Sequence, residues 1–162
     1  MFPSNKKKKL TIPEAQQKIY RYCAYQERSH QEVRNKLFEF GLSSNQVEEI
    51  IVSLITEGFL SEERFSKAFA GGKFRIKNWG RIKITKALEA KGVSSNCIKI
   101  GLQEIDETEY QKTLRTILQK KAEQTEEQNI FIKRDKIASF AIQKGFEPDL
   151  VWNELKSLLP DK

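Results

Sequence analysis

Three copies of one spacing constrain this chain more than any other feature of its sequence. In each copy, apolar residues stand eight and four positions before a glycine and six and ten positions after it. The glycines are Gly41, Gly92 and Gly145, which lie 51 and 53 residues apart. A shared period of this size predicts a tandem structural repeat. The apolar positions are Val33, Leu37, Val47 and Ile51; Ile84, Leu88, Ile98 and Leu102; and Ile137, Ala141, Val151 and Leu155.

Helix-start and helix-stop patterns surround these positions. Ser29 with Glu32, and Ser43 with Gln46, have the spacing of capping boxes, in which the two side chains satisfy free backbone N–H groups at a helix start. Gly41 suits the end of the helix between them, because a residue without Cβ adopts the left-handed cap readily. No segment combines strand alternation with hairpin turn chemistry. The sequence therefore predicts an all-α fold.

A leading helix precedes the two helices of each copy, beginning after Thr11, at Ser61 and near Asp106. Nine helices result, in three tandem three-helix repeats that form an elongated modular array without a sheet. Small units bury little surface alone, so neighbours are expected to pack or to be individually marginal. The predicted ranges are a disordered basic arm at 1–10 and repeats at 11–58, 59–105 and 106–162.

Apolar residues at the two junctions, Gly58-Phe59-Leu60 and Glu104-Ile105-Asp106, predict packed corners and not loose linkers. Two segments depart from a compact repeat. Gly71-Gly72 interrupts the leading helix of the second unit, and each glycine costs about 1 kcal/mol relative to alanine, so a kink or an early helix end is expected there. The predicted helix at 107–127 is longer than its counterparts.

The bulk composition bounds the class of protein. The formal net charge is +7 and the pI about 9.4, which favours an anionic partner such as nucleic acid, a membrane surface or an acidic protein face. No apolar run approaches membrane-spanning length. Cys23 and Cys97 have no nearby metal-ligand spacing and are read as buried or half-buried thiols in a reducing compartment. We therefore expect a cytoplasmic, monomeric protein without a cofactor or a metal.

Chemistry that would support an enzyme is sparse. The single histidine, His30, lies inside a capping box, where a helix-start role outweighs a catalytic one. Neither a glycine-rich phosphate loop nor a nucleophile elbow is present. The adjacent acids Glu62 and Glu63 point about 100° apart on a helix, so they form a solvated face and not a catalytic pair. The sequence predicts a binding protein without a catalytic site.

The unbalanced charge is concentrated between Ala70 and Lys91. This segment holds seven basic residues and one acid, so its charge of +6 nearly equals that of the whole chain. Such a cluster favours phosphate contact with an anionic partner over a merely solvated face, and it gives no evidence of base reading. Trp79 at the bend is read as a packing anchor in preference to a stacking platform. The candidate binding residues are Lys73, Arg75, Lys77, Arg81, Lys83 and Lys86.

The same stretch resembles a known family. The run from Leu54 to Phe65, followed by Trp79-Gly80, Lys83-Ile84 and Lys91-Gly92, is similar to the RecX family of bacterial recombination regulators. The family motifs match over about residues 20–105. After residue 105 the resemblance rests only on the repeat spacing. It implies a non-enzymatic modulator that binds RecA recombinase filaments on DNA and restrains their growth, ATP hydrolysis and strand exchange in recombination and DNA repair. By position, the six candidate residues would face the filament or its DNA.

Two other functions remain open from the residues. A plain nucleic-acid-binding helical protein would bind DNA through phosphate contacts without a recombinase, with strong salt dependence. A protein-interaction scaffold would use its charge only for solubility. Because the basic face of the second unit lies on its second helix and not its third, a standard recognition-helix insertion is disfavoured.

Overall fold

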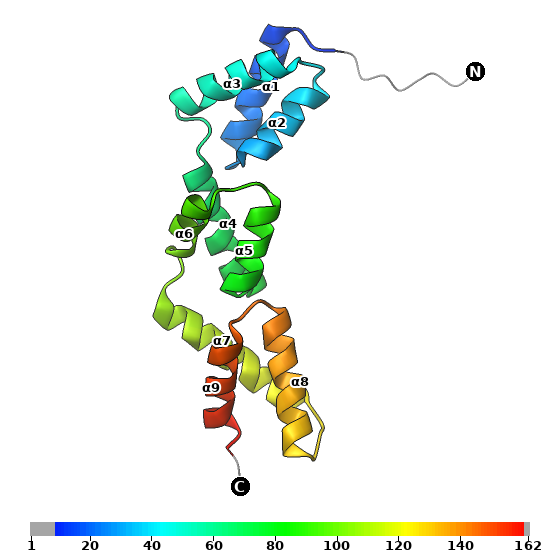
Figure 1. Ribbon diagram of the computed structural model, residues 1–162, viewed down its shortest axis with the longest axis vertical. Coiled ribbons are helices and arrows are strands. Elements are labelled where there is room, and N and C mark those ends of the chain that lie inside the picture. The colour runs from blue at the N-terminus through cyan, green and yellow to red at the C-terminus, as the bar shows by residue number, and fades with distance from the viewer. Residues whose placement is uncertain (1–8, 161–162) are drawn as a thin grey trace, which may run out of the picture.

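A computed structural model describes residues 9–160, and these residues form nine helices and no strand. The helices follow one another down a long column, three to each repeat, so that the N-terminal and C-terminal repeats lie at opposite ends (Figure 1). The predicted all-α array is confirmed. The helices are α1 (Ile12–Tyr25), α2 (His30–Glu39), α3 (Ser44–Thr56), α4 (Glu62–Lys77), α5 (Arg81–Ala90), α6 (Ser95–Leu102), α7 (Glu107–Gln124), α8 (Ile130–Gln143) and α9 (Pro148–Leu158).

The predicted helix boundaries have the expected chemistry. Ser29 and Ser43 both form complete capping boxes, with Glu32 and Gln46. The three repeat glycines all adopt positive φ, +87° at Gly41, +75° at Gly92 and +101° at Gly145. A residue with a Cβ rarely adopts this backbone conformation, so the recurring glycine permits the sharp turn between the second and third helices of each repeat.

The hydrophobic interior is divided unequally among the repeats. The first repeat has a core of its own, built around Ile19, Leu37 and Leu54. The second and third repeats share a single core, which runs without interruption from Phe65 to Leu155. Apolar burial is the main source of stability, so a shared core makes the second and third repeats one mechanical unit.

Polar contacts join the first repeat to the second. The Lys91 ammonium lies 2.9 Å from a Glu32 carboxylate oxygen, and the Arg64 guanidinium lies 2.9 Å from that of Glu27. The corner itself is packed, as predicted, because Leu60 is buried in the first core. Ile105 is likewise buried at the second corner. Both corners are thus packed, as the apolar residues in them predicted.

Two local predictions need correction, and a third lies mostly outside the described residues. Helix α4 continues through Gly71-Gly72 without a break; Gly71 is buried, and a Cβ there would lie 2.5 Å from the Arg75 guanidinium, so the missing side chain makes room for that group. Helix α7 ends at Gln124 instead of residue 127. Most of the predicted disordered arm, residues 1–8, lies outside the described residues. Leu10, at its end, belongs to the first repeat, because its backbone N–H donates to the Phe40 carbonyl at 2.9 Å.

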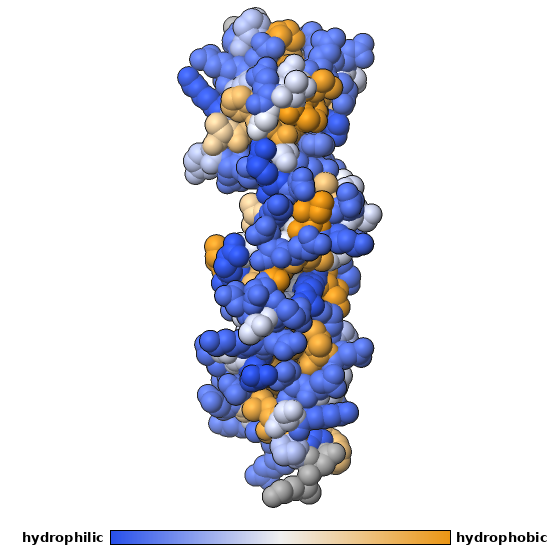
Figure 2. Space-filling view, turned by 90° about the vertical axis from the view of Figure 1, so that its left-hand side faces the viewer, coloured by the Kyte–Doolittle hydropathy of each residue, from blue (hydrophilic) through white to orange (hydrophobic). Residues whose placement is uncertain are grey.

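The outer surface of the column is mainly polar. Figure 2 shows one long face on which hydrophilic side chains predominate and apolar ones form separate areas. None of the helices in residues 9–160 combines the length and hydrophobicity needed to cross a membrane. Cys23 is buried and Cys97 half-buried, both as free thiols, in agreement with the sequence.

Candidate nucleic-acid interface

The turn between α4 and α5 positions the centre of the basic segment. Asn78 ends α4 in the left-handed conformation, with φ of 56°. This turn lets the Trp79 N–H donate to the Lys73 carbonyl at 3.1 Å, which folds the indole back along α4. The Trp79 ring then packs edge-on against Phe69, with 6.5 Å between ring centroids. Trp79 is half-buried against the shared core, so it is a packing anchor as predicted.

Two lysines from different helices lie over the remaining indole surface. The Lys73 Nζ is 4.9 Å from the Trp79 ring centroid and the Lys83 Nζ is 4.5 Å from it. A cation close to an aromatic face is attracted by the ring quadrupole, most strongly for tryptophan. Among the described residues, neither lysine forms an ion pair, so both ammonium charges remain uncompensated. The turn therefore presents a paired positive charge at a fixed position.

Lys77 and the exposed Ile76 extend this surface along α4. Together with Lys73 and Phe69 they line a shallow hollow of about 220 Å³. Ile76 is 78% exposed, the second most exposed of the large apolar residues in the described chain. We call Lys73, Lys77, Lys83, Ile76 and Trp79 the α4–α5 face. It combines uncompensated cations with an apolar side chain, that of Ile76, which is not packed in the core.

Arg81 does not belong to that outer face, contrary to the sequence prediction. Its guanidinium lies 3.8 Å from the Tyr110 ring centroid and pairs with the carboxylates of Glu147, at 2.8 Å, and Glu107. Its backbone N–H donates to the Tyr110 hydroxyl at 3.0 Å. These partners all lie in the third repeat, so Arg81 joins the two repeats and its charge is compensated.

The remaining two candidates lie beside the α4–α5 face. Arg75 lines a hollow with Glu109 and Lys112 of α7, toward the third repeat. Lys86 lines another with Glu89 and the paired Arg81. Among the described residues, neither Arg75 nor Lys86 forms an ion pair. The structure thus brings Lys73 and Lys83 together over Trp79, places Lys77 beside Lys73 along α4, and leaves Arg75 and Lys86 at the margins.

The junction with the third repeat holds α5 in place. Gly80 caps this helix without a side chain, and the third repeat supplies the missing acceptors: the Gly80 N–H donates to the Lys144 carbonyl at 2.7 Å, and the Ile82 N–H to the Gly145 carbonyl at 2.9 Å. A Cβ at Gly80 would lie 2.2 Å from the Gly145 backbone, so this approach requires glycine. The sequence analysis did not identify this contact.

Tyr110 and Glu147 complete the junction and were also missed. Tyr110 is fully buried between Phe74 and Phe146, and its hydroxyl donates to a Glu147 carboxylate oxygen. Burial, with that hydrogen bond adding to it, raises the pKa of Tyr110 above its usual range. Glu147 occupies the helix-cap position of the third repeat yet makes no cap hydrogen bond, because its carboxylate is committed to Arg81 and Tyr110.

Comparison with known proteins decides the family. Models of the first, second and third three-helix domains of RecX match residues 15–54, 61–102 and 107–154. The regulatory protein RecX of Pelodictyon phaeoclathratiforme is 30% identical over 134 residues, which span 82% of this chain and 79% of the relative. The chain belongs to the RecX family. RecX proteins are regulators and not enzymes, in agreement with the absence of a catalytic pattern in the sequence.

Other RecX proteins are similar in sequence and in fold. The protein of Prosthecochloris aestuarii is 28% identical over 85% of this chain and 89% of its own length. The chain spans only 52% of the Bacillus cytotoxicus relative, at 24% identity. The crystal structure of RecX from Lactobacillus salivarius superposes with a TM-score of 0.83, covering 91% of this chain and 96% of that one at 22% identity. The structural likeness shows that this chain shares the fold of that protein.

Proposed function

We propose that this chain binds RecA recombinase filaments on DNA and inhibits filament growth, ATP hydrolysis and strand exchange during recombination and DNA repair. Membership of the RecX family supports RecA as the partner. The observation that carries the site is the pair of uncompensated lysines over Trp79, Lys73 and Lys83, with Lys77 beside Lys73 along α4. The chain acts as a monomer in the cytoplasm.

The α4–α5 face offers two kinds of contact to such a filament. Its lysines suit DNA phosphates, since a flexible ammonium needs only charge and not a fixed angle. The exposed Ile76 between Lys73 and Lys77 suits an apolar contact with the recombinase itself. A surface that contacts protein and phosphate together distinguishes a recombinase filament from bare DNA.

The stiffness of the column supports an inhibitory effect. The second and third repeats share one core, so the α4–α5 face moves with the third repeat as one body. A body of two repeats that moves as one would resist rearrangement of the protomers that it contacts in the filament.

The test is the ATPase rate of a RecA filament on single-stranded DNA, measured with and without substoichiometric amounts of the protein. We expect the rate to fall and the filament length, seen by electron microscopy, to shorten. Unchanged rate and length at equimolar protein would refute the proposal.

A second candidate function is nucleic-acid binding without a recombinase, which the same lysines favour. It predicts salt-dependent binding to DNA alone. Charge reversal at Lys83 and Lys86 would remove that binding. Arg81 is unsuitable as a third position, because reversing its charge would place a carboxylate against Glu107 and Glu147 and destabilise the junction. DNA affinity that survives the double change would mean that these lysines are not the site.

A further inference from the structure

The third repeat carries an arrangement of lysines and an aromatic ring like that of the second. Phe140 is 37% exposed on α8. The Lys121 Nζ, from α7, lies 4.6 Å from its ring centroid, and the Nζ of Lys144, which caps the C-terminal end of α8, lies 5.7 Å from it. Neither lysine forms an ion pair among the described residues. Two lysines from separate segments thus hold their charges over one ring, as Lys73 and Lys83 do over Trp79.

The junction brings these two arrangements together. Lys144 precedes Gly145, and its carbonyl accepts the Gly80 N–H next to Trp79. A Cβ at Gly145 would lie 2.4 Å from the Cβ of Lys83, so the backbone of the third repeat lies directly against the lysine that covers the indole. The close glycine contact therefore places the backbone of Lys144, whose side chain reaches the Phe140 ring, beside Lys83 and the turn that holds Trp79.

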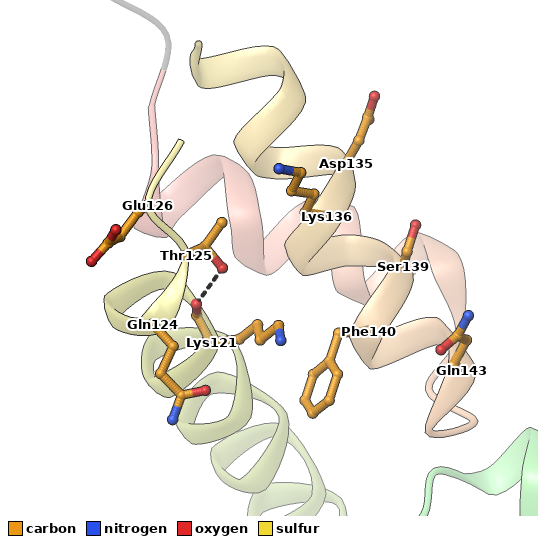
Figure 3. Close-up of a pocket in the computed structure, with 9 residues that line it drawn as sticks. All are labelled: Lys121, Gln124, Thr125, Glu126, Asp135, Lys136, Ser139, Phe140 and Gln143. Carbon is orange, nitrogen blue, oxygen red and sulfur yellow. Dashed lines mark hydrogen bonds between the residues drawn. The ribbon is translucent and has the colours of Figure 1, made fainter. Parts of the chain in front are cut away.

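A hollow beside Phe140 leaves this ring accessible. Between the C-terminal part of α7 and α8 it encloses about 600 Å³. In Figure 3, Lys121 and Phe140 point toward each other across this hollow, while Glu126 and Asp135 at its margin point away from the ring. The local charge next to Phe140 is therefore positive, although acidic residues occur nearby.

We propose that Lys73, Trp79 and Lys83, continued across the junction by Lys144, Phe140 and Lys121, form one cation–aromatic strip that binds a single strand of nucleic acid. The inference rests on the proposed function and extends its site into the third repeat. Alternation of rings with uncompensated lysines suits single strands, because an ammonium group that leaves its ring to contact a phosphate exposes that ring to an unpaired base. A duplex keeps its bases paired inside and gains nothing from the rings.

The charge alone predicts a measurable salt dependence. Each phosphate contact to a single strand contributes about −0.7 to the slope of log K against log salt concentration, so four lysines predict a slope of about −2.8. At 50 mM salt the same relation gives about an eightfold loss of affinity for each contact removed. Loss of the two third-repeat lysines should therefore weaken binding by well over tenfold.

Binding of a fluorescent 30-nucleotide oligo(dT) to the full chain, followed by anisotropy without RecA, tests the strip. For the double variant Lys121→Gln and Lys144→Gln, we expect at least tenfold weaker binding of oligo(dT). The slope of log K against log salt concentration should be smaller in magnitude by about 1.4. The matched control, Lys18→Gln with Lys99→Gln, removes two exposed lysines elsewhere and should bind as the unaltered chain does. Phe140→Leu keeps an apolar side chain and should lower affinity without changing the slope.

Indole fluorescence tests the aromatic part. Trp152→Phe leaves Trp79 as the single tryptophan. We expect oligo(dT) to quench its emission and polyglutamate of equal length to bind weakly and leave it unchanged. Equal binding of polyglutamate would instead identify an acidic peptide as the partner and overturn the proposal.

The two proposals fail in different ways. If Lys121→Gln with Lys144→Gln binds oligo(dT) normally while Lys73→Gln with Lys83→Gln does not, the third-repeat extension is wrong and the α4–α5 face stands. If the unaltered chain leaves RecA ATPase unchanged yet binds oligo(dT) through all four lysines, the strip stands and the proposed function is wrong.

Discussion

Replacing Tyr110 by Phe tests the junction that fixes the α4–α5 face. The ring remains between Phe74 and Phe146, and only the hydroxyl is lost. That hydroxyl donates to the Glu147 carboxylate and accepts a hydrogen bond from the Arg81 backbone N–H. A hydrogen bond to a charged group contributes about 1.5–3 kcal/mol and a neutral one about 0.5–1.5 kcal/mol, so the change should cost roughly 2–4 kcal/mol. For a chain of this size, 1 kcal/mol shifts the Tm by about 2–4 °C, so the Tm should fall by about 4–16 °C.

The chain offers a matched control for this change. The Tyr20 hydroxyl also donates to a carboxylate, that of Glu57 at 2.7 Å, but on the exposed surface. Tyr20→Phe should therefore cost less than about 1 kcal/mol, because water replaces the lost donor. Thermal unfolding of both variants by circular dichroism makes the comparison. Equal Tm values for the two variants would refute the claim that the Tyr110 hydroxyl is a buried link between repeats.

The pH dependence of stability gives a second measurement on the same residue. The pKa of Tyr110 is raised in the folded state, whereas an unfolded tyrosine ionises near pH 10. The stabilisation is therefore complete below about pH 10 and is lost as the pH rises above that value. Chemical denaturation between pH 9 and 11 should show this loss in the unaltered chain. Tyr110→Phe should lack it.

Two further predictions concern the turns and the thiols. Gly145→Ala should destabilise the chain by about 2–5 kcal/mol, because the positive φ and the contact with Lys83 both oppose a Cβ. Gly58→Ala meets only the backbone strain and should cost about 1–2 kcal/mol. Similar denaturation midpoints for the two variants would contradict this prediction. Burial raises the pKa of Cys23 to about 11. Iodoacetamide at pH 7.5 should therefore modify Cys23 at least about tenfold more slowly than the half-buried Cys97, which peptide mass spectrometry can measure. Faster labelling of Cys23 would contradict its burial in the core of the first repeat.

Local patterns in the sequence were enough to predict the repeats. The spacing around Gly41, Gly92 and Gly145 reflects helix geometry and the left-handed turn, both of which depend on residues within one repeat. The capping boxes at Ser29 and Ser43 depend on three-residue spacings. Such features are visible without knowledge of the tertiary structure.

The junction could not be predicted in this way. Arg81, Tyr110 and Glu147 come from three separate places in the chain and meet only because the second and third repeats pack together. Sequence reasoning therefore placed Arg81 on the outer face by helix periodicity, which says nothing of a neighbouring repeat. Lys73 and Lys83 were predicted as binding residues because they lie in the basic segment, but their contact with Trp79 was not predicted.

The third-repeat lysines could have been found by aligning the repeats. Lys91 and Lys144 both directly precede a repeat glycine, and both lie near an aromatic ring, Phe69 at 5.8 Å and Phe140 at 5.7 Å. Charge counting missed Lys144 because the third repeat is not basic as a block. Position within the repeat is more informative here than local charge density.

The central claim is that the α4–α5 face meets the recombinase filament, and one measurement tests it most directly. The RecA ATPase rate on single-stranded DNA is titrated with the unaltered chain, with Lys73→Glu plus Lys83→Glu, and with Lys18→Glu plus Lys99→Glu as a control of equal charge change on exposed sites elsewhere. We predict that inhibition is lost only in the Lys73 and Lys83 variant, while its Tm stays close to that of the control. Full inhibition by that variant, or equal loss in both variants, would contradict the account.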